Sequence, residues 1–202
     1  MRALTLPHPS PVSHHGRGAR GEGQGGRSMP ESLYTSQEPF VEPESSVLVI
    51  CCSSNAFLPY TQEFLERQLG LGPGNYDLLA VPGGPQFLLL TEYLPKFAWV
   101  GHRWVKFLIE RHRLKRVIVI SHEDCAWYSE ERFVPQFLHA ARGLHLRLPE
   151  AGEDARSRRS LAQREDLREI VHALHALELP ISVEAYYAEK SSDGRVRFQK
   201  EA

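Results

Sequence analysis

Two short segments of the sequence carry side chains that bind transition metals. "VLVICCSSN" contains Cys51 and Cys52, and "VIVISHEDCAWY" contains His122 and Cys125. A turn that leaves a strand can direct residues i and i+3 to one side, so His122 and Cys125 could bind one ion, with Cys51 or Cys52 as a third ligand. Zinc prefers thiolate and imidazole, and three protein ligands leave a fourth position for water. In the alternative interpretation, the thiols are small buried hydrophobes and His122 is a hydrogen-bonded core residue.

These segments follow predicted strands. From residue 46 onward, short apolar runs alternate with longer amphipathic runs, a pattern typical of β-α units around a parallel sheet. Runs that are apolar on both faces predict buried parallel strands at 46–52, 76–82 and 116–120. Open α/β sheets bind ligands at the carboxyl ends of such strands, which is where the candidate metal ligands lie.

The remaining periodicity predicts helices and a final hairpin. Helices are expected at 59–71, at 86–113 with an interruption near Pro95, at 133–144 and at 161–179. Strands at 181–189 and 195–199 flank a turn at 192–194. The predicted fold class is therefore α/β, with a mainly parallel central sheet flanked by helices and with antiparallel strands at the C-terminal end.

Composition limits the classes of function. Gly, Pro, Ser, His and Arg dominate residues 1–45, which predicts a disordered or arm-like N-terminal leader, followed by a single α/β zinc-binding domain at 46–202. The formal net charge of -1 gives no reason to expect nucleic acid as a partner. No apolar run is long enough to cross a membrane, and Met1 to Pro11 is too short an apolar run for a signal peptide. Three cysteines do not form a disulfide framework, so we expect reduced thiols and a cytoplasmic location.

The order of these motifs resembles that of the β-class carbonic anhydrases, and most of all a bacterial carbonic-anhydrase-like branch. The resemblance covers Val47 to Tyr128 and rests on a cysteine ending the first strand, "YDLLAVPGG" at the second and "HEDCAWY" after the third. It implies a Zn²⁺ held by Cys52, His122 and Cys125, and a homodimer or higher homo-oligomer. It also implies reversible hydration of CO2 to bicarbonate by zinc-bound hydroxide. The alternatives are a catalytically degenerate zinc-binding scaffold and a hydrolase of a CO2-like substrate such as COS or CS2.

The first motif of that family, C-x-D-x-R, is incomplete here. With Cys52 as ligand, Ser54 and Ala56 stand at the aspartate and arginine positions; with Cys51, the residues are Ser53 and Asn55. Two thiolates already neutralise Zn²⁺, so bound water should be less acidic than under three histidines and should depend more on a group that orients it. Ser54 could supply one hydrogen bond without charge. Asp124 and its neighbour Glu123, beside the ligands, could orient water or the imidazole.

Other features of the sequence allow a functional and a structural interpretation. Gly83 and Gly84 could let backbone N–H groups approach a bicarbonate oxygen, or could serve only to form a turn. They match neither a Walker loop nor a dinucleotide fingerprint, which disfavours a nucleotide-binding domain. His172 and His175 share a helix face, but charged neighbours and the lack of a third ligand indicate surface residues.

Overall fold

The computed structural model describes residues 34–42, 45–91, 95–128 and 153–202. The helix predicted at 133–144 lies outside these residues. Residues 34–42 contain neither helix nor strand, and the chain from Val41 onward forms one compact unit. In the part of the chain that the structure describes, no helix combines the length and apolar character that a membrane span requires.

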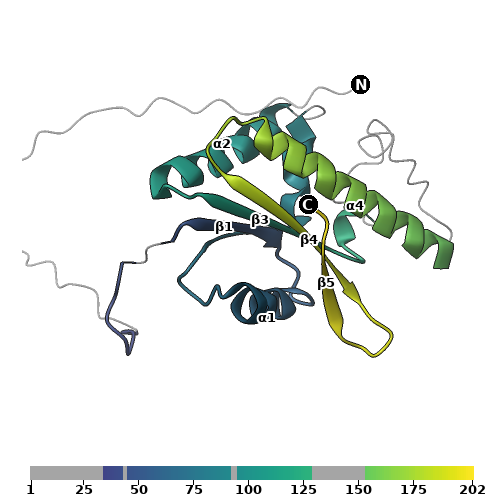
Figure 1. Ribbon diagram of the computed structural model, residues 1–202, viewed down its shortest axis with the longest axis horizontal. Helices are drawn as coiled ribbons and strands as arrows, with labels where there is room; N and C mark the ends of the chain where they lie inside the picture. The colour runs from purple at the N-terminus through teal and green to yellow at the C-terminus, as the bar shows by residue number, and fades with distance from the viewer. Residues whose placement is uncertain (1–33, 43–44, 92–94, 129–152) are drawn as a thin grey trace, which may run out of the picture. The chain divides into compact units, whose positions relative to one another are not determined.

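A five-stranded sheet lies at the centre of this unit. The strands are β1 (Val47–Cys52), β2 (Asp77–Val81), β3 (Arg116–His122), β4 (Ser182–Lys190) and β5 (Val196–Lys200). Their order is β2-β1-β3-β4-β5; β1 to β4 are parallel, and β5 is antiparallel to β4 (Figure 1). The predicted fold class is confirmed.

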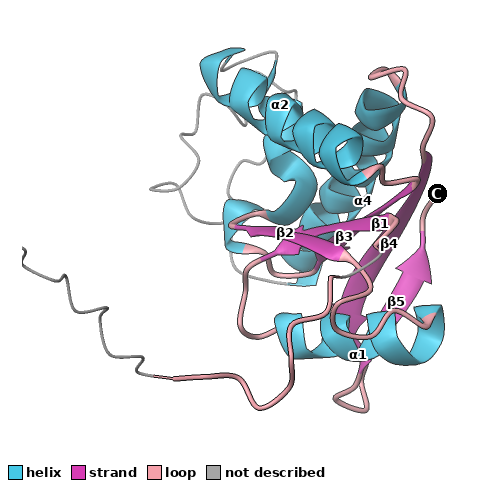
Figure 2. Ribbon diagram, turned by 90° about the vertical axis from the view of Figure 1, so that its left-hand side faces the viewer, coloured by secondary structure: helices cyan, strands magenta, loops and turns pink. Residues whose placement is uncertain are grey.

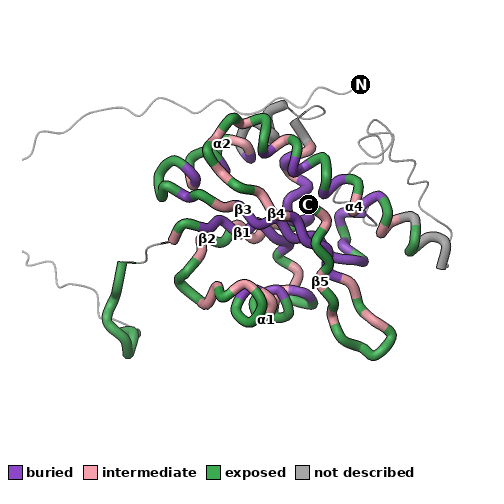
Figure 3. Tube along the Cα trace, viewed as in Figure 1, coloured by how far each residue is buried: buried purple, intermediate pink, exposed green. Residues whose placement is uncertain are grey.

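Helices cover both faces of the sheet (Figure 2). Helix α1 (Leu58–Leu69) packs on one face. The other face is covered by the 3-10 helix η1 (Gly84–Thr91), by α2 (Pro95–His112) and by α4 (Glu153–His175). Each face of the sheet has its own hydrophobic core, and alternate residues of β1 point into the two cores. Leu48 and Ile50 lie on the α4 side, and Val49 and Cys51 lie on the α1 side. Purple along the strands in Figure 3 marks this double burial.

Two predicted boundaries were wrong in ways that bear on the site. The third strand does not end at residue 120 but continues to His122, because β4 pairs with it as far as Ala188. Helix α4 starts at Glu153, eight residues before the start predicted from its apolar stripe, since its first two turns are mainly charged. The first part of the helical region predicted at 86–113 is a 3-10 helix, η1, and the one-turn 3-10 helix η2 (Ala126–Tyr128) was not predicted.

The strand register brings the predicted ligands to one edge of the sheet. Cys51 pairs with Ile120, so the ends of β1 and β3 lie side by side. His122 pairs with Ala188 on the next strand, whose carbonyl accepts the N–H of Glu123 at 2.9 Å. The carboxyl ends of three neighbouring strands therefore fix the positions of Cys52 and His122.

A carboxylate at the far end of the sheet gives a test of this pairing. Glu184 on β4 accepts a hydrogen bond from Arg116 Nε on β3 at 2.5 Å, and Lys200 on β5 lies 3.4 Å away. Partial burial acts to raise its pKa, but hydrogen bonds from Arg116 and Tyr186 and the charges of Arg116 and Lys200 outweigh it and lower the pKa to about 2.

We expect Glu184→Gln to reduce the free energy of unfolding by about 2 kcal/mol at pH 7. Because the pKa of Glu184 is lower in the folded than in the unfolded state, its stabilisation is fully present above pH 4.5, the pKa of the unfolded state. The stabilisation is lost as the pH falls toward 2, the pKa of the folded state. Urea unfolding from pH 7 to pH 2.5 measures the difference between wild type and variant. The exposed Glu165→Gln on α4 serves as control; a Glu184→Gln penalty that persisted undiminished at pH 2.5 would contradict the assignment.

Candidate metal centre

Three potential metal ligands meet at the carboxyl ends of β1 and β3. Cys52, His122 and Cys125 each offer a ligand atom, and these atoms lie within 4.8 Å of one another. The two Sγ atoms are 4.0 Å apart. All three residues are buried, with 9%, 6% and 5% of their surface exposed. Two sulfurs and an imidazole converging from separate segments form a donor set that zinc prefers.

The histidine ring is held in one orientation. Its Nδ1 lies 2.7 Å from the carbonyl oxygen of Glu123, which can only accept, so Nδ1 carries a proton and donates it. Nε2 is buried and has no hydrogen-bond partner among the described residues. With Nδ1 donating to a carbonyl, Nε2 is the ring nitrogen left to bind a metal, and the bond at Nδ1 fixes the orientation of the ring. Glu123 does orient the imidazole, one of the roles that its place beside the ligands allowed, but it does so through its backbone carbonyl.

The thiols are electrostatically unequal. A hydrogen bond from the Cys125 thiol lowers the pKa of Cys52 to about 4; burial opposes this, while His122 and the Ser54 backbone N–H contribute to it. The same hydrogen bond, together with burial, raises the pKa of Cys125, whereas the backbone N–H groups of Trp127 and Gly83 act in the opposite direction. The centre thus stabilises one thiolate, and N–H donors point to both sulfurs.

Cys51 belongs to a different environment. It lies in the apolar cluster on the α1 side of the sheet, because successive residues of a strand face opposite ways. Burial, and then the charge of Cys52, raise the pKa of its thiol to about 12. Of the two neighbouring cysteines, the structure brings Cys52 to His122 and Cys125 and leaves Cys51 among hydrophobes.

The glycine turn after β2 packs directly against the cluster. Gly83 and Gly84 both have positive φ, 83° and 64°. A Cβ on Gly84 would lie 3.0 Å from the backbone nitrogen of Cys52, and one on Gly83 would lie 2.4 Å from the ring of Trp127. Both glycines are therefore required by close packing as well as by backbone angle. The turn packs the start of η1 against the backbone of Cys52, and the backbone N–H of Gly83 points to the sulfur of Cys125.

An aromatic ring and a charged cluster flank His122. The ring of Phe57 stacks on the imidazole, with centroids 4.2 Å apart. Asp124 adopts a left-handed conformation, with φ of 53°, and its carboxylate lies 2.9 Å from Arg156 and 3.3 Å from Lys190. Partial burial raises the pKa of Asp124, but the hydrogen bonds and charges of those two cations outweigh it and leave the pKa below its ordinary value. Lys190 also donates its backbone N–H to the carboxylate of Glu123 at 2.7 Å.

The segment after Cys125 is fixed to the helix layer. Trp127 and Tyr128 of η2 are buried, and the hydroxyl of Tyr128 donates a hydrogen bond to the buried carboxylate of Asp166 on α4. No pattern in the sequence predicts this contact, because Asp166 is one of several charged residues in the run 164–169 and its burial depends on the fold. The turn that carries Cys125 is thereby held from both sides, by Gly83 and by α4.

The other predicted site residues have plainer surroundings. Ser54 is half-buried, and its backbone carbonyl accepts the N–H groups of Phe57 and Leu58 at the start of α1. Ala56 is exposed. His172 and His175 are exposed on α4, away from any group of potential metal ligands among the described residues. The assignments of Ser54 and Asp124 to catalysis stay predictions.

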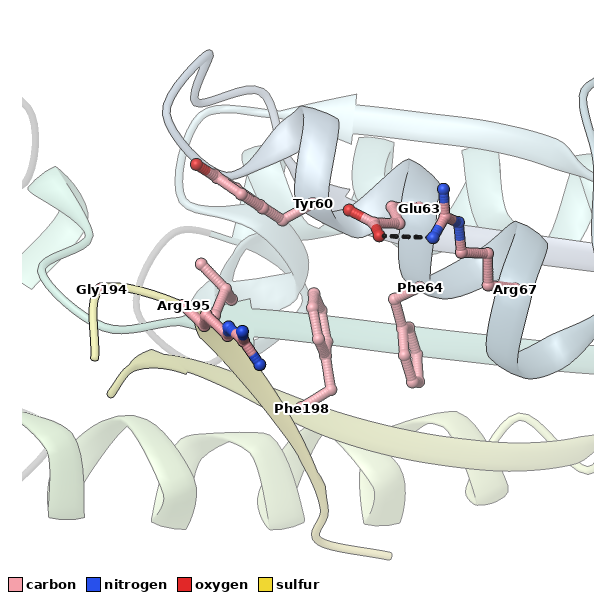
Figure 4. Close-up of a pocket in the computed structure, with 8 residues that line it drawn as sticks. Tyr60, Glu63, Phe64, Arg67, Gly194, Arg195 and Phe198 are labelled. Atoms are coloured by element: carbon pink, nitrogen blue, oxygen red, sulfur yellow. Dashed lines mark ion pairs between the residues drawn. The ribbon is translucent and has the colours of Figure 1, made fainter. Parts of the chain in front are cut away.

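A separate hollow of about 450 Å³ lies between α1 and the hairpin of β4 and β5 (Figure 4). Its floor includes Phe64 and Phe198, whose rings stack 4.2 Å apart. Its rim carries Arg67, paired with Glu63 at 3.4 Å, and Arg195, which lies 3.9 Å from Asp193. It shares no residue with the cysteine and histidine cluster.

No family model and no curated protein matches the chain. Solved structures do. The similar structures described below are carbonic anhydrases.

The β-carbonic anhydrase CafA of Aspergillus fumigatus has 18% identity, with 79% of this chain and 77% of that chain covered and a TM-score of 0.47. The carbonic anhydrase of Glaciozyma antarctica has 20% identity, coverage of 80% and 85%, and a TM-score of 0.46. A structure of tetrameric β-carbonic anhydrases from Sordaria macrospora has 13% identity, with 77% of this chain and 81% of that chain covered and a TM-score of 0.42. The resemblance seen in the sequence is thereby confirmed at the level of the fold.

The packing of Gly84 predicts an unusually large cost for adding one methyl group. Gly84→Ala should lower the free energy of unfolding by about 3 kcal/mol, since the new Cβ is strained at positive φ and also displaces the backbone of Cys52. Gly70→Ala is the matched control: its φ is 68°, and nothing lies within 4 Å of the added Cβ. It should cost about 1 kcal/mol from backbone strain alone. Equal losses in urea unfolding would contradict the close packing.

Proposed function

We propose that Cys52, His122 and Cys125 bind zinc, and that the protein carries out reversible hydration of CO2 to bicarbonate at that ion. The observation that supports this proposal most directly is the Nε2 of His122, which is buried without a hydrogen-bond partner among the described residues and lies beside two sulfurs 4.0 Å apart. An unpartnered buried nitrogen costs roughly 1–3 kcal/mol, which a metal–nitrogen bond would remove. The donor set therefore fits the ion.

Charge also favours zinc in this centre. Two thiolates balance the charge of Zn²⁺, so a buried ion would leave no net charge to be solvated. Three protein ligands leave one position open, which is the arrangement of catalytic zinc sites. Bound there, zinc would supply a Lewis acid that lowers the pKa of a bound water and so favours hydroxide as the nucleophile.

The chain's own residues would do the positioning. The carbonyl of Glu123 keeps a proton on Nδ1 and so keeps Nε2 available, and Phe57 covers one face of the imidazole. Backbone N–H groups of Ser54, Gly83 and Trp127 favour the charged form of the sulfurs. Ser54 is proposed to give water a hydrogen-bonding partner.

A second candidate is a zinc-binding scaffold without hydration activity, or one that acts on COS or CS2. It is favoured by the surroundings of the cluster: Ser54 and Ala56 bring no charge, and the carboxylate of Asp124 is already paired with two cations. With Asp124 so engaged, we propose it as a residue that holds the turn and only secondarily as one that orients water.

Location and assembly are also proposals. All three cysteines are free, and thiols stay reduced in the cytoplasm, which we propose as the compartment. We propose a homodimer or higher homo-oligomer that takes a small-molecule substrate and binds neither nucleic acid nor membrane.

The ligand assignment predicts a difference between adjacent cysteines. After dialysis against a weak chelator, wild type and Cys51→Ser should retain one zinc per chain, while Cys52→Ser, His122→Ala and Cys125→Ser should retain almost none. Zinc should raise the melting temperature of the first two only, because metal binding energy stabilises the folded state. Metal analysis with thermal unfolding measures both, and zinc loss in Cys51→Ser with retention in Cys52→Ser would reverse the assignment.

The reaction itself is tested by stopped-flow CO2 hydration on protein of known zinc content. Wild type should exceed the buffer rate, and Cys125→Ser should not. The double variant Ser54→Asp and Ala56→Arg should raise the rate several-fold by adding a charged acceptor for water. No rate at one zinc per chain would reject hydration and favour the scaffold.

A further inference from the structure

A buried glutamine next to the cluster has no assigned role. Gln86 lies on η1 with 1% of its surface exposed. Its Nε2 donates to Ser121 Oγ at 2.9 Å, while its Oε1 is buried with no hydrogen-bond partner among the described residues. Because a buried acceptor without a hydrogen-bond partner destabilises the fold, its presence calls for a group that it binds.

Its surroundings place this amide at the metal centre. Gly84, two residues earlier, packs on the backbone of Cys52. Ser121 follows Ile120, the residue that pairs with Cys51, so it lies beside the end of β1 where Cys52 stands. Ser121 continues the series Val117 and Val119, and Cys52 continues the series Leu48 and Ile50, so both residues lie on the face of the sheet that η1 covers. The hydrogen bond to Ser121 thus holds the Gln86 amide beside the end of β1 that carries Cys52.

The chemistry of the site leaves a role for a neutral acceptor. No carboxylate stands at Ser54, and that of Asp124 is paired with Arg156 and Lys190. Water and the hydroxyl of bicarbonate each carry a proton that needs an acceptor, and an amide oxygen accepts it without repelling an anion. Among the residues that the structure describes, none donates a hydrogen bond to the Oε1 of Gln86, so this oxygen can accept that proton.

We propose that Gln86 binds bicarbonate or water at this centre. Its Oε1 accepts a hydrogen bond from the hydroxyl of bicarbonate or from the water molecule. This inference rests on the proposed function, since it needs a metal at Cys52, His122 and Cys125. Ser121 is a positioning residue, because it acts by holding the amide.

The chain offers a matched control. Gln163 on α4 is as buried as Gln86, with 1% of its surface exposed. Only one of its two amide atoms is hydrogen-bonded: Oε1 accepts a hydrogen bond from the hydroxyl of Tyr187 at 2.6 Å, and Nε2 has no partner among the described residues. Tyr187 stands on β4, one strand further from β1 than Ser121. Methionine is unbranched and close to glutamine in length, so Gln86→Met and Gln163→Met remove comparable groups from the same core.

The test uses cobalt(II) in place of zinc, because its visible absorption reports both metal binding and the fourth ligand. We expect wild type, Gln86→Met and Gln163→Met to bind one Co²⁺ per chain with the same spectrum. Titration with bicarbonate should give a Kd at least 10-fold weaker in Gln86→Met than in wild type, equivalent to about 1.4 kcal/mol. Gln163→Met should stay within twofold of wild type, and thermal unfolding of the cobalt forms checks that the two variants are folded.

The outcomes separate this inference from the proposed function. If all three proteins bind Co²⁺ and Gln86→Met binds bicarbonate as wild type does, the role of Gln86 is rejected and the metal centre stands. Equal weakening in both variants, or no spectral response of wild type to bicarbonate, also rejects it. Failure of wild type to bind Co²⁺ or Zn²⁺ rejects both the metal centre and the role of Gln86.

Discussion

The parallel pairing of β1 with β3 is the constraint on which the candidate centre depends. These strands are separated by more than sixty residues in sequence, yet their register sets Cys51 against Ile120 and so aligns their carboxyl ends. One thiol and one imidazole then arrive at the same edge without any contact between their side chains being needed to bring them there. The second thiol follows after a short turn. The cost of ordering these groups is met by the buried apolar residues of both strands, which pack against helices on either side.

Backbone groups from several segments surround the three ligands and add to the effects of the thiol–thiol hydrogen bond and of burial. The imidazole is oriented by a carbonyl, and the sulfurs receive N–H groups from three separate segments. Such an arrangement depends on the exact path of the chain, which explains the two glycines that touch the cluster. It also explains why Tyr128 is tied to Asp166: the turn bearing Cys125 has little regular structure of its own and is stabilised by α4.

The sequence was sufficient for the sheet, the antiparallel end and the meeting of a cysteine of the first strand with His122 and Cys125, because these follow from apolar runs and from the rule that parallel strands end together. It could not choose between Cys51 and Cys52 without the resemblance, since the choice depends on which face of β1 each thiol occupies. Gln86 was missed because an isolated glutamine has no periodicity or spacing. Burial with one amide atom unpaired became visible only in the fold. The extension of β3 to His122 was missed because its cause lies on β4, about 65 residues away.

The charges beside His122 have a consequence for how ligands reach the centre. Glu123 and Asp124 contribute two negative charges, and Arg156 and Lys190 contribute two positive ones within 4 Å of them. The local sum is zero, so this group of charges neither attracts anions nor repels them over distances comparable with the Debye length of about 8–10 Å. Encounter with a small neutral gas or with a monovalent anion would then depend on diffusion, and salt concentration would have little effect on its rate.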